Sequence, residues 1–166
     1  MSWEKDLPAA LAQWLSERGI PARTGWTGTP CSGLTAPTAV VTVRGFAADC
    51  GGFADYLGER YDEEKSRWEE VYGKKVQLTL GLDLYAPERS SEGEMQALLE
   101  QIVRVLTLEC PEGMQVGEFT CAETKWDEGQ RKLKREVSLK CTLWLQAVMD
   151  EYGEFLDFEL RGGWKV

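Results

Sequence analysis

The side chains that most often perform acid–base chemistry are unevenly represented in this sequence of 166 residues, which contains no histidine. Acids are abundant, so a pair of carboxylates is the natural candidate for general acid–base catalysis. The visible clusters are Glu123 with Asp127 or Glu128, and Asp150 with Glu151. Such a pair needs one buried carboxyl group, and these acids fall at predicted turns where water solvates both. The pattern argues against an enzyme.

The cysteines form no catalytic or metal-binding pattern. Five are present: Cys31, Cys50, Cys110, Cys121 and Cys141. None are spaced as CxxC. The absence of histidine excludes a Cys–His pair and leaves only thiolates and carboxylates as possible zinc ligands, without the usual spacing. We expect buried free thiols, no metal and no cofactor. The sequence also contains no P-loop and no dinucleotide-binding glycine motif.

The net charge of −9 bears on the choice of partners. An acidic protein has no electrostatic attraction for phosphate backbones or anionic lipids, so sequence-specific nucleic-acid binding and membrane binding are not expected. The basic run KLKR at 132–135 is interpreted as the solvated start of a strand. No apolar run reaches the roughly 18 residues of a membrane helix. We expect a soluble cytoplasmic protein.

The N-terminal third predicts one helix and a long connection. A helix is expected over 6–18, with Asp6 as its cap and Gly19 after its end. Residues 19–37 are rich in Gly, Pro and Thr and predict a long loop. Trp26 lies in this loop, either folded back on the core or serving as an interface anchor.

The middle of the chain predicts a strand and a hairpin. Residues 38–46 form a short strand that breaks at the following AADCGG, and 74–85 alternate strictly between apolar and polar side chains. The spacing over 53–73 fits either a helix or a strand. We favour a hairpin with an acidic turn at 62–65 and a long second strand that breaks near Gly73.

The last part predicts a second helix followed by three strands. Ser91 and Glu94 form a capping box before an apolar helix face, and the helix ends before Pro111. Alternating runs at 115–126, 133–149 and 154–160 then form a meander. The expected fold is a single α+β domain over 1–166. It has an antiparallel or mixed sheet, two amphipathic helices on one face, and a sheet-and-helix body over 38–164.

Surplus aromatic side chains and acidic turns indicate a protein contact surface. Trp144 falls on the polar face of its strand, where it either packs across strands or contacts a partner. Trp126 lies beside a turn. The candidate interface residues are Trp26, Asp62, Glu63, Trp126, Asp127, Glu128, Trp144, Asp150 and Glu151.

Three segments together resemble a known family. They read EEVYGKKVQLTLGLDLYAP, GEFTCAETKWDE and LKCTLWLQAVMDEYGEFLDFELRGGW. Their order and residue pattern over about 38–164 resemble those of proteins encoded by prophage tail genes of Gram-positive bacteria. More broadly, the chain resembles the tail terminator, or tail-completion, proteins of long-tailed phages. The resemblance implies a subunit of a hexameric ring that caps the tail tube and joins it to the head connector. It implies assembly in the host cytoplasm, a place in the virion tail, and no catalytic residues.

Two other classes of function stay open. A small acidic binding protein of the toxin-immunity type would use the same acids and aromatic side chains against one basic partner. A small enzyme would need a concave pocket that holds at least one buried acid.

Overall fold

The computed structural model describes residues 3–25, 33–50 and 55–160. Within them the chain forms two helices and seven strands of one mixed sheet. In chain order the elements are α1 (Trp3–Glu17), β1 (Ala22–Thr24), β2 (Thr38–Cys50), β3 (Tyr56–Asp62), β4 (Arg67–Ala86), α2 (Glu92–Leu108), β5 (Met114–Asp127), β6 (Lys132–Asp150) and β7 (Phe155–Leu160).

Two long strands, β4 and β6, run antiparallel side by side. Their pairing begins where Glu69 lies opposite Asp150 and ends where Ala86 lies opposite Leu133. On the far edge of β4, β2 pairs with residues 74–85 and β3 pairs with residues 67–72. On the far edge of β6, β5 pairs with residues 132–143 and β7 with residues 145–149. The sheet therefore has two zones. One is a body of order β1-β2-β4-β6-β5, and the other is an extension of order β3-β4-β6-β7.

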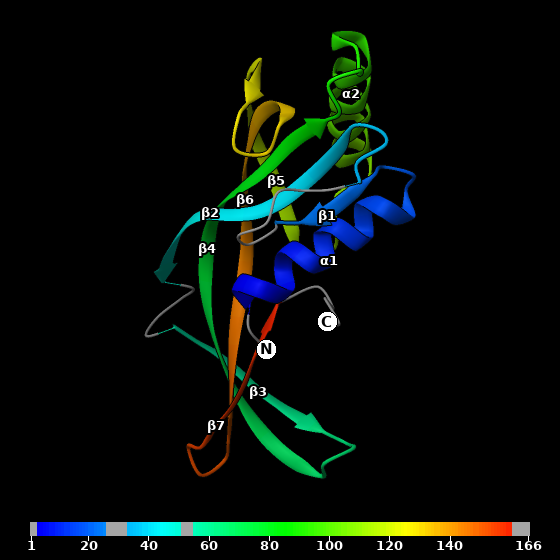
Figure 1. Cartoon of the computed structure of the whole chain (residues 1–166). Helices are drawn as coiled ribbons and strands as arrows, with labels where there is room; N and C mark the ends of the chain where they lie inside the picture. The colour runs from blue at the N-terminus through cyan, green and yellow to red at the C-terminus, as the bar shows by residue number, and fades with distance from the viewer. Residues whose placement is uncertain (1–2, 26–32, 51–54, 161–166) are drawn as a thin grey trace.

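We call this extension the arm and define it as residues 56–72 and 145–160. Figure 1 shows the arm projecting below the body, away from both helices. It consists of two hairpins, β3–β4 and β6–β7, joined through the β4–β6 pairing. Because β4 and β6 continue from the body without interruption, the arm is a direct extension of the same sheet.

The core lies between the body of the sheet and the two helices. The predicted alternation on β4 is confirmed, because Val76, Leu78, Leu80, Leu82 and Leu84 are all buried. From α1 the core receives Leu7, Leu11 and Leu15, and from α2 it receives Met95, Ile102 and Leu106. One continuous cluster contains both helices and the sheet, which confirms the α+β fold with two amphipathic helices on one face and a C-terminal meander.

The helix ends follow local capping chemistry. The Ser91–Glu94 capping box is present at the start of α2, with Glu94 N donating to Ser91 Oγ at 3.2 Å and Ser91 N donating to Glu94 Oε2 at 2.7 Å. Gly19, at φ +77°, ends α1 as predicted. The expected start of α1 at Asp6 is wrong, since the helix begins at Trp3 and contains Pro8 in its interior.

Three strand predictions are corrected. The predicted loop 19–37 contains β1, which pairs parallel with β2 but is too short to show any periodicity. β2 does not break after residue 46, because pairing with β4 continues to Cys50. β4 does not break at Gly73. There the absent side chain makes room for Leu57, whose Cδ1 lies 2.4 Å from the position of an added Cβ. Residues 67–72 are a strand.

Candidate protein-interaction surface

The predicted acids at the hairpin turns hold the turns together. Asp62 Oδ1 accepts the backbone N–H groups of residues 64 and 65 at 3.0 and 3.1 Å. Asp150 Oδ1 accepts those of residues 152 and 154 at 3.0 and 2.8 Å, and Asp127 Oδ1 accepts that of residue 130 at 3.1 Å. Hydrogen bonds from Lys65, its backbone N–H first, lower the pKa of Asp62. Each aspartate therefore has a local structural role as a turn cap.

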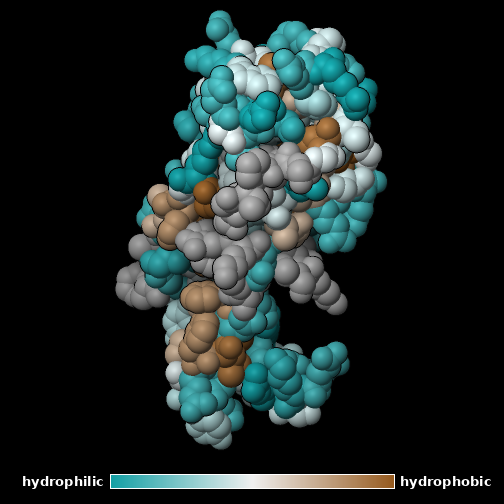
Figure 2. Space-filling view, viewed as in Figure 1, coloured by the Kyte–Doolittle hydropathy of each residue, from teal (hydrophilic) through white to brown (hydrophobic). Residues whose placement is uncertain are grey.

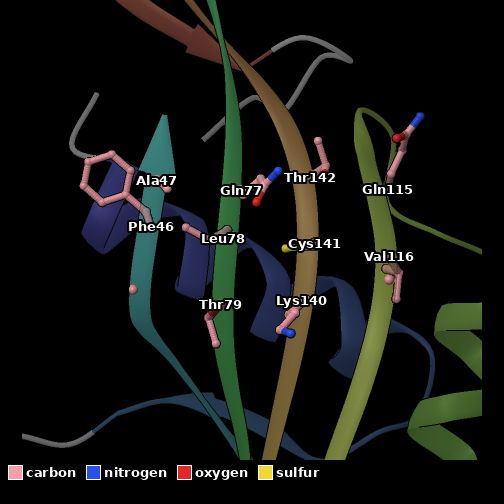
Figure 3. Close-up of a pocket in the computed structure, with 12 residues that line it drawn as sticks. Phe46, Ala47, Gln77, Leu78, Thr79, Gln115, Val116, Lys140, Cys141 and Thr142 are labelled. Carbon is pink, nitrogen blue, oxygen red and sulfur yellow. The ribbon is translucent and has the colours of Figure 1, made fainter. Parts of the chain in front are cut away.

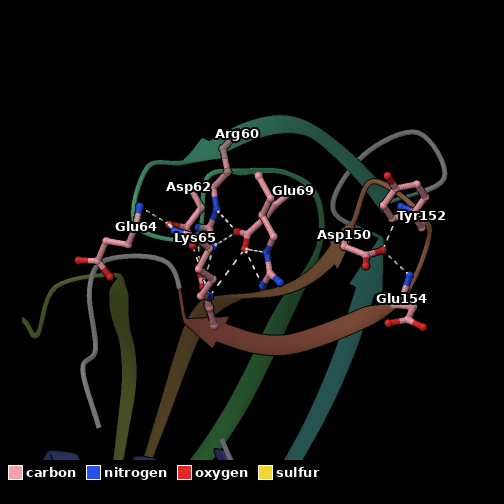
Figure 4. Close-up of polar contacts among 10 residues, drawn as sticks. Arg60, Asp62, Glu64, Lys65, Glu69, Asp150, Tyr152 and Glu154 are labelled. Atoms are coloured by element: carbon pink, nitrogen blue, oxygen red, sulfur yellow. Dashed lines mark hydrogen bonds and ion pairs between the residues drawn. The ribbon is translucent and has the colours of Figure 1, made fainter.

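The predicted interface residues fall into separate groups. Asp62 and Glu63 lie at one turn of the arm, and Asp150 and Glu151 lie at the other. Figure 4 shows Asp62 and Asp150 in two separate groups, so the structure places these acids on the arm without bringing them together. Trp126, Asp127 and Glu128 lie at the β5–β6 turn, at the opposite end of the long strands. Trp144 is half-buried on β6, opposite Lys75 and on the face away from the helices. Trp26 lies outside the described residues.

The thiols are only partly as expected. Cys141 is buried and free, and burial, with a smaller effect from Cys110, raises its pKa to about 12. Cys110 and Cys121 are exposed, which corrects the prediction of buried thiols. Cys121 lies opposite Val137 on the edge strand β5, and its Sγ accepts a hydrogen bond from Arg135 Nε at 2.9 Å. Cys31 and the side chain of Cys50 lie outside the described part of the chain.

A hollow of about 570 Å³ runs along the body of the sheet. Figure 3 shows the side chains that line it on β2, β4, β6 and β5, among them Gln77, Thr79 and Thr142. No acid lines it, and its lysine, Lys140, pairs with Glu118 at 2.7 Å. The residues around this hollow therefore supply no carboxylate pair for acid–base chemistry.

The buried carboxylate of the body is fully engaged. Asp83 forms an ion pair with Arg44, and its Oδ1 also accepts the backbone N–H of Val137 at 3.2 Å. It fills the position where β4 and β6 skip direct pairing, between Gly81–Ser138 and Leu84–Arg135. Asp83 therefore supplies a side-chain acceptor to the backbone N–H of Val137 on the neighbouring strand.

The arm has two different faces because its side chains alternate. We call one the inner face and define it by Arg60, Glu69, Val71, Val148 and Glu159. Glu69 is only 1% exposed and accepts hydrogen bonds from Arg60 Nε and Nη2 at 3.0 and 2.9 Å. Arg67 donates to the other carboxylate oxygen at 3.3 Å. Figure 4 shows this ion cluster between the strands of the arm.

Arg60 also ties the two outer strands of the arm together. From β3 its Nη2 reaches Glu159 of β7 at 2.8 Å, across the intervening strands β4 and β6. Val71 and Val148, paired on those central strands, are 8% and 2% exposed and are buried within the inner face. The inner face is thus held by charged pairs around a small apolar centre.

We call the opposite side of the arm the aromatic face. It is formed by Tyr56, Tyr61, Trp68, Tyr72, Phe155 and Phe158, which lie on one side by strand register. Three ring pairs have centroids about 5 Å apart, at 5.4 Å for Tyr56–Tyr72, 5.4 Å for Tyr61–Trp68 and 4.9 Å for Phe155–Phe158. All but Tyr72 are between 38% and 55% exposed.

The aromatic face continues the side of the sheet that the helices cover in the body. On β4, Trp68, Glu70 and Tyr72 keep the same alternation as the core residues Val76 and Leu78, with no irregularity in the register with β6. In the arm, the corresponding side chains are exposed. Figure 2 shows hydrophobic side chains gathered on the arm between its hydrophilic turns and the body. Large exposed apolar patches of this kind mark contact sites.

Sequence reasoning found the acidic turns but missed the aromatic face. The signal was present in the alternation of Trp68 and Tyr72 on one strand and in the rings at Tyr56 and Phe158 on others. Combining them requires the pairing of β3 with β4 and of β6 with β7, including the irregular register at each. Those bulges depend on tertiary pairing and leave no periodic pattern in the sequence.

Comparisons with known proteins assign no family. The sequence matches no known protein-family model. No curated protein has significant sequence similarity to it. Among the described residues, neither helix combines the length and the apolar composition needed to cross a bilayer. In the same part of the chain, no three His, Cys, Asp or Glu side chains are grouped to hold a metal ion.

Proposed function

We propose that this chain is a structural subunit of a phage tail, of the tail terminator type, and not an enzyme. In this proposal, copies assemble in the host cytoplasm into a ring, expected to be hexameric, that caps the tail tube and joins it to the head connector. The aromatic face of the projecting arm carries the proposal. A ring subunit needs such a surface for contact with a neighbour, and it needs no catalytic group.

The size of this face supports a role in protein contact. With about 200 Å² of surface per aromatic side chain, the five half-exposed rings present roughly 500 Å². A standard interface buries about 800 Å² on each partner. The face therefore supplies most of one interface, and it is rich in the Trp, Tyr and Phe side chains that are enriched in interface cores.

The arm also suits a contact between unlike surfaces. It projects from one end of the body (Figure 1), so it can reach a region of a neighbour that is unlike the arm itself. Contacts between unlike surfaces generate closed rings when the rotation between subunits closes. The resemblance of residues 38–164 to tail terminator proteins gives this geometry a specific function.

Light scattering across a range of protein concentrations tests the proposal. The expected result is a mass of six chains, or growth toward it as the concentration rises. Trp68→Thr should weaken this growth, whereas Trp126→Thr, which removes an exposed tryptophan at the other end of the strands, should leave it unchanged. A constant monomer mass at every concentration would count against ring formation.

The charge of the arm favours one other function. Its segments contain eleven acidic and three basic residues, a net charge of −8, while the whole chain carries −9. A toxin-immunity type of protein would use this charge to neutralise a basic partner. It would remain a monomer or a dimer and would bind that partner tightly, with an association rate that falls steeply as salt is added.

A further inference from the structure

Two carboxylates lie in the middle of the aromatic face. Glu59 of β3 and Glu70 of β4 are directly opposite each other, between the Tyr61–Trp68 row and the Tyr56–Tyr72 row. Like charges in directly opposed positions destabilise a sheet. Among the described residues, neither glutamate forms an ion pair, although Glu70 accepts a hydrogen bond from Tyr72 Oη at 3.0 Å. The face thus contains an uncompensated pair of negative charges.

The cations of the arm are all occupied elsewhere. Arg60 and Arg67 bind Glu69 on the inner face, and Lys65 pairs with Asp62 and Glu69 at 3.3 and 3.8 Å. The aromatic face is left with rings and carboxylates. Desolvation first, and then Glu59 and Glu70, raise the pKa of Tyr56.

The charge of the arm decides between possible occupants of this face. A second arm would bring −8 against −8, and phosphate backbones or anionic lipids would be repelled in the same way. The rest of a second copy carries a net charge of only −1 and contains 16 of the 19 Lys and Arg residues, so the body of a neighbouring copy can offer a locally basic segment. A cationic side chain suits both the carboxylates and the rings of this face. It pairs with carboxylates and is attracted to the faces of aromatic rings.

We propose that the aromatic face of the arm binds a basic segment on the body of a neighbouring copy, with arginine or lysine side chains lying between the rings and pairing with Glu59 and Glu70. This inference rests on the proposed role of the arm as a docking element and adds the chemistry of its partner. Arginine is the preferred cation. Its planar guanidinium stacks on aromatic rings and binds carboxylates through two hydrogen bonds.

Calorimetric titration of the full chain with three capped ten-residue peptides tests the inference. One peptide alternates arginine with alanine, the second alternates lysine with alanine, and the third alternates glutamate with alanine. The expected order of affinity is arginine above lysine, with no binding of the glutamate peptide. Equal affinity for all three peptides, or binding of none, would overturn the inference.

Paired variants separate a built site from general attraction to negative charge. Glu59→Gln with Glu70→Gln should weaken binding of the arginine peptide about tenfold, since both partners of the guanidinium are lost. Glu63→Gln with Glu64→Gln removes the same charge from the nearby turn and should weaken binding only about twofold through the long-range field. Equal losses in both pairs would overturn the inference, because they would indicate binding to charge alone.

The rings provide a second comparison. Trp68→Thr should reduce affinity for the arginine peptide about tenfold, whereas Trp126→Thr should leave it unchanged. Threonine suits an exposed strand position, and circular dichroism confirms that each variant is folded. An unchanged affinity in Trp68→Thr contradicts the site. These outcomes are independent of the mass measurement. Rings that form from a chain whose monomer binds no peptide refute only this inference, and a chain that binds the peptide but stays a monomer refutes only the ring.

Discussion

Glu69→Gln is expected to destabilise the arm more than any conservative change on its surface. The substitution keeps the size of the side chain but removes the charge that Arg60, Arg67 and Lys65 surround. Removing one partner of a buried ion pair costs about 3–5 kcal/mol when the remaining charge stays buried. Here the remaining cations are between 34% and 57% exposed, so water can solvate them, and Arg60 keeps Glu159.

The expected loss is therefore below that range, at about 2 kcal/mol of unfolding free energy. Urea denaturation followed by circular dichroism measures it, and hydrogen exchange at Val71 and Val148 shows whether the loss lies in the arm. The matched control is Glu70→Gln, the next residue on the same strand, which faces the other side and should change stability by less than about 0.5 kcal/mol. Equal effects in the two variants would refute the reasoning, because the buried cluster would then contribute no more than an exposed carboxylate.

Three further results are expected. Gly81→Ala should cost about 2 kcal/mol in urea denaturation, since the new Cβ would lie 2.9 Å from Arg44 Nε and displace it from its buried carboxylate partner; an unchanged midpoint would contradict this. Ser91→Ala should cost about 1 kcal/mol by removing the cap of α2, with a Ser91→Thr control close to wild type. Iodoacetamide at pH 8–9, followed by peptide mass mapping, should label exposed Cys110 quickly and Cys141 slowly. The raised pKa of about 12 keeps the Cys141 thiol protonated in this range, and labelling at equal rates would refute its burial.

The body of the fold was predictable because its residues carry strong local patterns. Strict alternation over 74–85 and the helical spacing from Met95 to Leu106 each place apolar side chains on a single face. The capping box at Ser91 fixes the start of a helix through two hydrogen bonds within one turn. In each case one segment contains the whole signal, so no knowledge of the other elements is required.

The arm was not predictable in the same way. Its existence depends on β2 and β3 sharing one edge of β4, and on β5 and β7 sharing one edge of β6. No periodicity within a single strand encodes that division. The short strand β1 was missed for a related reason, since three residues paired with β2 show no pattern of their own.

The roles of the predicted site residues become separable only in the folded structure. Asp62, Asp127 and Asp150 were expected at an interface, and each caps its own turn through backbone N–H groups. Glu69 follows the predicted hairpin turn by a few residues. It is nearly fully buried in an ion cluster that no local sequence motif predicts. Burial of a charged side chain depends on partners from several strands, and that information is absent from any one segment.

The proposed function requires that copies of this chain form rings through the projecting arm. Negative-stain electron microscopy of the concentrated protein tests it most directly, with the Trp68→Thr variant prepared in parallel. We expect closed rings of six subunits for the original chain and fewer rings for the variant. Single particles of one chain, or rings that form equally well without the Trp68 side chain, would contradict it.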